Sequence, residues 1–160
     1  TYIILAAKLG RILKQKEEPT KNLLGIILIK ETTMAIFTHV TLGTNNFDVA
    51  VGFYDSVLGA LDINNLGKLH DTAMTYGKES FEFVVLTPSN GEPACSANGG
   101  TVGFVATSRD AVHKFHEAGL ANGGIDEGGP GPRSFAPNAY AAYLRDPDGN
   151  KITAICFTSE

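Results

Sequence analysis

The sequence predicts an α+β fold made of two βαβββ modules, and three observations support this. The chain repeats itself without gaps when it is shifted so that Asp48 aligns with Asp110 and Phe53 aligns with Phe115. Both copies begin with a β-type run, a polar cap residue and an amphipathic helical pattern. Both copies then end with two strand-like runs separated by a short connection. A duplicated supersecondary unit explains all three observations.

Module one spans residues 35–97. Its first strand is predicted over residues 36–42, and Asn46 is the predicted helix cap. The helix follows because apolar residues recur at helical spacing and a glycine stands at its end; these positions are Val49, Ala50, Phe53, Val57 and Gly59. Three further strands are expected, near residues 62–66 and over residues 73–76 and 81–86.

Module two spans residues 98–158 and repeats this order. A strand over residues 101–106 precedes the cap residue Ser108, and the helix stripe consists of Ala111, Val112, Phe115 and Ala118. A faint strand signal lies near residues 124–126. A hairpin joins residues 140–145 to 151–157 through Asp-Pro-Asp-Gly at 146–149, because proline presets φ and glycine accepts the left-handed conformation.

Residues 123–137 are too rich in glycine and proline to predict a regular element. Two interpretations remain open for this segment. It is a surface crossover between elements, or it is a mobile lid in which Arg133 recognises an anionic or carbonyl group of a ligand.

One helix covers one face of each small sheet, so the other face stays open. Placed side by side, either within one chain or between two chains of a dimer, the modules form a curved, half-open mixed sheet around a cavity, with the helices on the outside. Alternation places six side chains beneath the helices: Val40, Leu42, Val102, Phe104, Ile152 and Ala154. The open face is predicted to hold Phe37, His39, Thr41, Thr101, Gly103, Val105, Thr153, Ile155 and Phe157.

The composition of the chain argues against several classes of function. The net charge of −4 argues against binding to a nucleic-acid backbone. Neither apolar run of the first thirty-three residues is long enough for a membrane-spanning helix, so no membrane partner is expected. The two cysteines, Cys95 and Cys156, are too few for a disulfide framework and predict a cytoplasmic protein with reduced thiols.

Residues 1–33 differ from the rest, and two interpretations remain open for this N-terminal extension. Tyr2, Leu5, Leu9 and Ile12 share one helical stripe, which predicts a short amphipathic helix before Pro19, and residues 23–29 read as an edge strand. Alternatively, Met34 is the natural start and the preceding stretch is appended or a mis-assigned start. The repeat pattern begins directly after Met34, which favours the second interpretation.

The pattern resembles the vicinal oxygen chelate superfamily, which includes glyoxalase I, extradiol dioxygenases, fosfomycin-resistance enzymes and bleomycin-binding proteins. Three segments carry the resemblance: Phe-Thr-His-Val-Thr-Leu at 37–42, Gly-Phe-Tyr-Asp-Ser-Val-Leu-Gly at 52–59, and Tyr-Leu-Arg-Asp-Pro-Asp-Gly-Asn-Lys-Ile at 143–152. The resemblance covers residues 35–157. The sequence also resembles the glyoxalase-like subgroup, given Pro130, Gly131 and Arg133 ahead of Tyr140 and the final hairpin.

The resemblance implies a divalent metal on the cavity wall, held from the first and last strands of each module. These positions carry His39, Val85 (or Val84 if the register slips), Thr101 and Thr153. Only His39 is a good ligand, because neutral threonine hydroxyls bind such metals weakly. Glu82 is aimed at the other face by alternation unless a bulge intervenes. We therefore expect no cofactor and no tight metal at the usual place of the family.

The sequence thus predicts a homodimeric, glyoxalase-related protein that binds a small organic ligand in the sheet cavity. His39 is the single catalytic and metal-ligating candidate. The expected ligand-binding residues are Phe37, Thr41, Tyr76, Val85, Thr101, Arg133, Tyr143, Thr153 and Ile155. The alternative is a metal-dependent lyase, isomerase or dioxygenase with non-standard ligands such as Glu79 or Glu82. A third hypothesis is an interaction module whose own side chains fill the cavity.

Overall fold

The structure is a computed structural model that describes residues 36–159, which lie within one compact unit of residues 35–160. The helix and the edge strand predicted within residues 1–33 lie outside the described residues. Within residues 36–159, no helix has the length and apolar character needed to cross a membrane.

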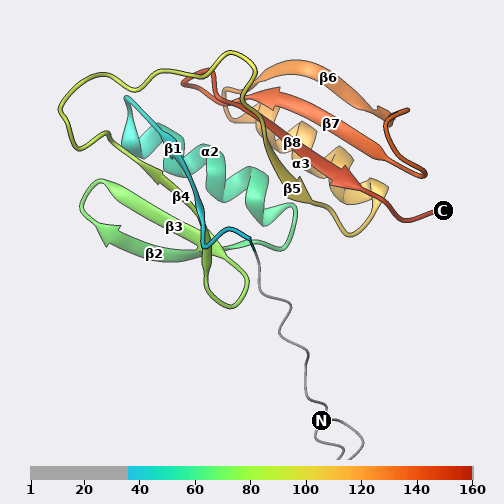
Figure 1. The fold of residues 1–160 in the computed structure, drawn as a ribbon, viewed down its shortest axis with the longest axis horizontal. Coiled ribbons are helices and arrows are strands. Elements are labelled where there is room, and N and C mark those ends of the chain that lie inside the picture. Colours follow the sequence, from blue (N-terminus) through green and yellow to red (C-terminus); the bar gives the residue numbers. More distant parts are fainter. Residues whose placement is uncertain (1–35, 160) are drawn as a thin grey trace, which may run out of the picture. The chain divides into compact units, whose positions relative to one another are not determined.

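The predicted duplication is confirmed: each half contains one helix and four strands (Figure 1). Module one comprises β1 (Val40–Gly43), α2 (Phe47–Gly59), β2 (Asn64–His70), β3 (Ala73–Gly77) and β4 (Phe81–Leu86). Module two comprises β5 (Val102–Val105), α3 (Arg109–Ala121), β6 (Ile125–Pro132), β7 (Tyr140–Arg145) and β8 (Lys151–Cys156). The sheets have the orders β1-β4-β3-β2 and β5-β8-β7-β6. In each sheet the first strand is parallel to the last, and the other pairs are antiparallel.

The two helices begin at the caps that the sequence predicts. The Asn46 side chain accepts a hydrogen bond from the Val49 amide at 3.3 Å, and the Ser108 hydroxyl accepts one from the Ala111 amide at 3.1 Å. The first turn of each helix contains an acidic residue, Asp48 in α2 and Asp110 in α3. Its negative charge interacts favourably with the positive end of the helix dipole. Local chemistry therefore determines where both helices start.

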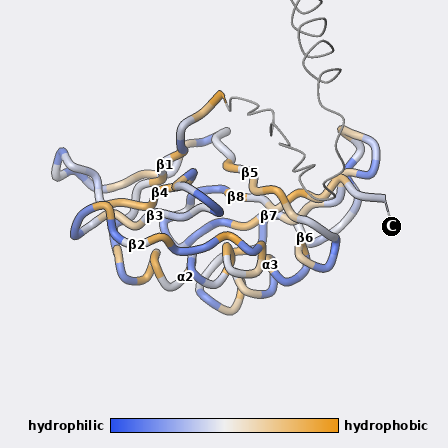
Figure 2. The backbone as a smooth tube through the Cα atoms, turned by 90° about the horizontal axis from the view of Figure 1, so that it is seen from below, coloured by the Kyte–Doolittle hydropathy of each residue, from blue (hydrophilic) through white to orange (hydrophobic). Residues whose placement is uncertain are grey.

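Both helices lie on the same side of the two sheets and pack against each other (Figure 2). The core between helices and strands is continuous across the modules, and the rings of Phe83 and Phe104 meet edge to face with centroids 5.3 Å apart. The predicted inward stripes are buried except at Ala118, which is partly buried, and at Val49, which is 47% exposed. In α2, Tyr54 and Leu58 take the inner face in place of Val49.

The glycine- and proline-rich segment forms a regular element, contrary to the sequence prediction. Strand β6 runs through it as an edge strand that pairs with β7 alone. Its ladder shifts register around Gly128, which has a φ of +146°, and an edge tolerates the missing amide hydrogens of Pro130 and Pro132.

The predicted turn between β7 and β8 also joins the two modules. The carboxylate of Asp148 accepts hydrogen bonds from the Thr44 hydroxyl at 2.6 Å and from the Asn45 amide at 2.8 Å. The Asn150 side-chain amide donates to the Gly43 carbonyl at 3.1 Å. Residues 43–45 connect β1 to α2, so the turn of module two is docked on the first loop of module one.

Strands β6, β7 and β8 are linked by Glu127. Its carboxylate lies 2.7 Å from Arg145 and 3.0 Å from Lys151. The hydrogen bond from Arg145, followed by that from Lys151, lowers the pKa of Glu127 below its ordinary value of 4.5.

We expect Glu127→Gln to destabilise the protein slightly at neutral pH. A lowered folded-state pKa means that the carboxylate contributes stability above pH 4.5, which is lost as the pH falls through the folded-state pKa. Urea denaturation at a series of pH values should therefore show the variant and the wild type converging in acid. Glu117→Gln, on the exposed side of α3, is the control. A stability difference that stays constant across the acid range would contradict this assignment.

Candidate functional site

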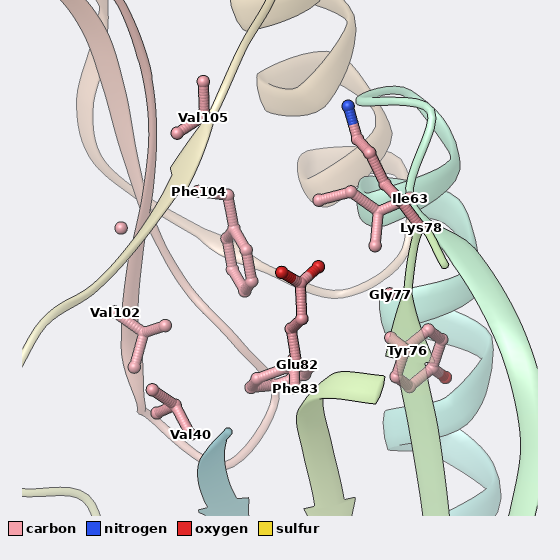
Figure 3. A pocket seen from close by; sticks show the side chains of 11 residues that line it. Val40, Ile63, Tyr76, Gly77, Lys78, Glu82, Phe83, Val102, Phe104 and Val105 are labelled. Atoms are coloured by element: carbon pink, nitrogen blue, oxygen red, sulfur yellow. The ribbon is translucent and has the colours of Figure 1, made fainter. Parts of the chain in front are cut away.

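A cavity of about 330 Å³ opens between the two modules (Figure 3). Its walls come from β1, β3, β4 and β5, and from the connections that flank β2 and β3. The lining residues are Val40, Ile63, Tyr76, Gly77, Lys78, Glu82, Phe83, Val102, Gly103, Phe104 and Val105. Most of these side chains are apolar or aromatic, which is typical of sites for small organic molecules.

Glu82 projects its carboxylate into this cavity between the side chains of Phe104 and Tyr76 (Figure 3). The pairing explains this orientation: Tyr76 faces Phe83 while Gly77 faces Phe81, so Glu82 is the extra residue of a β-bulge. Strict alternation predicted the other face for Glu82. Within residues 36–159 its carboxylate has no hydrogen bond or ion pair.

Gly77 is the local signal that sequence reasoning missed. A Cβ at this position would lie 1.8 Å from the Ser80 carbonyl oxygen, so the β3–β4 turn requires glycine here. The register shift that turns Glu82 lies at this glycine. Gly77, Lys78 and Phe104 all line the cavity, although none was among the predicted ligand-binding residues.

Tyr76, one of the expected ligand-binding residues, lines the cavity with its ring only. Its hydroxyl points away from the cavity (Figure 3) and donates to Asp55 at 3.0 Å. Burial, followed by the charge of Asp55, raises the pKa of Tyr76 well above its usual range. This phenol is therefore protonated, and its proton is donated to a residue of helix α2.

His39 lies outside this cavity. Its ring is exposed and contacts Phe81 with centroids 5.3 Å apart. Together with Phe37 and Glu82 it lines a second, wider hollow of about 550 Å³. His39 and Glu82 thus border the same hollow, and Glu82 and Val40 line both the hollow and the cavity.

The prediction for Val85 is wrong by one residue. Val85 pairs with Leu42 and Met74 and is fully buried in the core beneath α2. Val84 shares the face of Thr41, with which it pairs. The register slip arises because the sequence shows two adjacent valines and no signal for which of them faces inward.

Thr153, Tyr143 and Ile155 share the open face of module two, as alternation predicts. The Thr153 hydroxyl is buried and donates to the Ala142 carbonyl at 2.8 Å. Thr101 lies apart, in a small hollow of about 80 Å³ beside Leu42. None of these four side chains lines the cavity between the modules.

The guanidinium of Arg133 makes its hydrogen bonds within its own module. Its guanidinium donates to the carbonyls of Gly129 at 2.8 Å and Ala141 at 2.9 Å, and it lies over the ring of Tyr143 at 5.3 Å. These contacts attach the end of β6 to β7. Arg133 does not line the cavity, so the structure gives no support to its predicted role in ligand binding.

The residues at the expected metal positions do not fit a divalent metal. His39, Thr101, Thr153 and the valine of β4 together supply one imidazole and two hydroxyls, of which that of Thr153 is already bonded to the backbone. Across residues 36–159, no group of three or more His, Cys, Asp or Glu side chains lies close enough together to hold a metal ion.

Comparison with known proteins supports the fold. The model of the glyoxalase/bleomycin resistance protein/dioxygenase superfamily matches residues 36–153. The chain is similar to a solved glyoxalase/bleomycin resistance protein from Albidiferax ferrireducens, with 44% identity, coverage of 76% of this chain and 98% of that chain, and a TM-score of 0.69. Among the curated proteins there is no match.

Two more distant structures share the fold. A lactoylglutathione lyase from Agrobacterium tumefaciens is 21% identical over 77% of this chain and 94% of its own, with a TM-score of 0.55. A fosfomycin resistance protein from Listeria monocytogenes is 13% identical over 78% and 95%, with a TM-score of 0.56. At sequence identities this low, the similarity shows a shared fold and gives no information about activity.

Proposed function

Because the chain belongs to the glyoxalase/bleomycin resistance protein/dioxygenase superfamily, we propose that it binds a small organic ligand in the cavity between its two modules. The observation that carries this proposal is the cavity itself, which combines apolar walls from both sheets with the carboxylate of Glu82, a group without a hydrogen bond or ion pair to other residues in the range 36–159. A volume of about 330 Å³ lies at the small end of ligand sites, so the ligand is small.

Val105→Trp tests this proposal. Val105 lines the cavity but is 73% exposed, so the larger side chain narrows the site without disturbing the core. A thermal-shift screen of small oxoacids, thiol adducts and aromatic compounds should find ligands that raise the melting temperature of the wild type. We expect the same ligands to bind Val105→Trp more than about tenfold more weakly.

The matched control is Leu120→Trp, which places the same bulk on the outer side of α3, where Leu120 is 45% exposed and away from the cavity. This variant should bind like the wild type. Equal binding by all three proteins would place the ligand elsewhere, and a screen without any stabilising compound would count against a ligand-binding function.

One observation favours a second candidate, a metal-dependent lyase, isomerase or dioxygenase. His39 and Glu82 line the same hollow, so two donors of suitable type are present, and further donors would have to come from outside residues 36–159 or from another subunit. Elemental analysis of protein offered Ni, Zn, Mn and Fe(II) separately distinguishes the candidates. A stoichiometric metal that is lost in His39→Ala favours the enzyme.

We also propose that the protein is a cytoplasmic homodimer. Cys95 and Cys156 are both free, which agrees with a reducing compartment. Ile36, Phe37 and Phe157 are large apolar side chains that are more than half exposed, and a second copy would cover them. Sedimentation of the purified protein measures its oligomeric state directly.

A further inference from the structure

The cavity has an unusual charge distribution for an apolar site. Three aromatic rings line it: those of Tyr76 and Phe83, with centroids 6.0 Å apart, and that of Phe104. Glu82 is the carboxylate that extends among these side chains (Figure 3). Two exposed charged residues, Glu82 and Lys78, therefore border otherwise apolar walls.

The protein does not neutralise the charge of Glu82 within the described residues. Lys78 is the one cation that lines the cavity, but its ammonium is directed away from the Glu82 carboxylate (Figure 3), and no ion pair joins the two side chains in residues 36–159. Tyr76 cannot donate to Glu82 either, because its hydroxyl is bound to Asp55. The polar partner of Glu82 is thus left for a ligand to supply.

The chemistry of the walls determines which ligand meets this requirement. Glu82 is an exposed residue, so its carboxylate attracts a cation at the intermediate dielectric constant of a protein surface, which is still below that of water. The faces of aromatic rings carry partial negative charge and also favour cations. An anionic ligand would be repelled by Glu82, and the exposed Lys78 is the one lining side chain within residues 36–159 with which it could pair.

We infer that the ligand of this cavity is a small organic cation with an apolar body, whose charged group pairs with Glu82 while its body lies among Tyr76, Phe83 and Phe104. This inference rests on the proposed ligand-binding function and specifies the chemical class of the ligand.

Three probes with one phenyl ring and different head groups test the inference: 2-phenylethylammonium, 2-phenylethanol and 3-phenylpropanoate. Their dissociation constants are measured by calorimetry on the full chain, with a chelator present so that no metal bridges probe and protein. We expect the cation to bind about tenfold more tightly than the alcohol, and the anion to bind most weakly.

Glu82→Gln removes the charge and keeps the shape of the side chain. It should weaken binding of the cation about tenfold and leave binding of the alcohol unchanged, so the alcohol also reports that the cavity is intact. Glu117→Gln, on exposed α3 and away from the cavity, should leave all three affinities unchanged. Lys78→Gln should tighten binding of the cation severalfold, because a like charge at the cavity is lost.

The outcomes separate this inference from the proposal on which it rests. If all probes bind the wild type equally and Val105→Trp abolishes their binding, the cavity binds ligands but the inference is wrong. If Glu82→Gln keeps the preference for the cation, Glu82 is not its partner. If the cation binds equally to wild type and Val105→Trp, both proposals fail for this cavity.

Discussion

Asp146→Ala is expected to lower the free energy of unfolding by about 3–5 kcal/mol, as for other losses of a buried, hydrogen-bonded charge. Asp146 is 2% exposed and accepts hydrogen bonds from the Tyr54 hydroxyl at 2.7 Å and from the Asn150 side-chain amide at 2.9 Å. Its other oxygen accepts from the amides of Asp148 and Asn150 at 3.0 and 2.8 Å. Alanine leaves these donors without an acceptor.

The position of Asp146 makes the loss larger than the hairpin alone would suggest. Tyr54 belongs to α2 of module one, whereas Asp146 begins the turn of module two, so their hydrogen bond joins the modules. Burial, followed by the charge of Asp146, raises the pKa of Tyr54 well above its usual range, and the hydroxyl remains a donor. Asp146→Ala therefore also loosens the docking of one module on the other.

Urea denaturation measures this effect against Asp71→Ala, which removes an exposed carboxylate without a described partner. Asp71→Ala should change stability by less than about 0.5 kcal/mol. Asp146→Asn should lie between the wild type and Asp146→Ala, because it keeps an acceptor oxygen. A loss below about 1 kcal/mol for Asp146→Ala would show that these hydrogen bonds do not hold the modules together.

Gly119→Ala and Gly52→Ala should have opposite effects, although both exchange a glycine for alanine within a helix. A Cβ at Gly119 would lie 2.2 Å from a terminal methyl of buried Leu144 and 3.4 Å from Val57 of the other helix. Such overpacking costs about 1–3 kcal/mol. A Cβ at Gly52 would have no atom within 4 Å among residues 36–159, apart from its chain neighbours and the backbone of its own helix, so alanine should stabilise the protein by about 0.5–1 kcal/mol through its helix propensity.

Chemical denaturation of both variants measures the change in the free energy of unfolding that close packing causes at Gly119 and that helix propensity causes at Gly52. If Gly119→Ala were also stabilising, the packing of α3 on β7 and α2 would have to be looser than the structure shows. A destabilising Gly52→Ala would mean that a partner covers this exposed face of α2.

The organisation of the fold could be predicted because its signals are local and occur twice. Asn46 and Ser108 start the helices, and the Asp-Pro-Asp-Gly turn closes the last hairpin, each through hydrogen bonds or φ preferences within a few residues. The apolar stripes of the helices and the alternation along β1, β5 and β8 depend on periodicity alone. These elements required no knowledge of the tertiary structure.

The candidate site could be predicted only in part, because its residues depend on register. His39 and Phe37 do line a hollow of the structure. Val85 was placed on the wrong face because its orientation follows from pairing with β1 and β3, which a single strand does not reveal. Glu82 enters the cavity through a bulge beside Gly77, where period-two alternation fails.

The sequence by itself determined two modules, their helices, their hairpins and membership of a fold with an open sheet face. Only the tertiary structure decided that the glycine- and proline-rich segment pairs as β6, that Asp146 joins the modules, and that Glu82 is the charge inside the cavity. The physical reason is the distance along the sequence over which each kind of interaction acts. Capping, turn chemistry and periodicity act between neighbours in the chain, whereas an edge strand, a contact between modules and a bulge depend on partners that are distant in sequence.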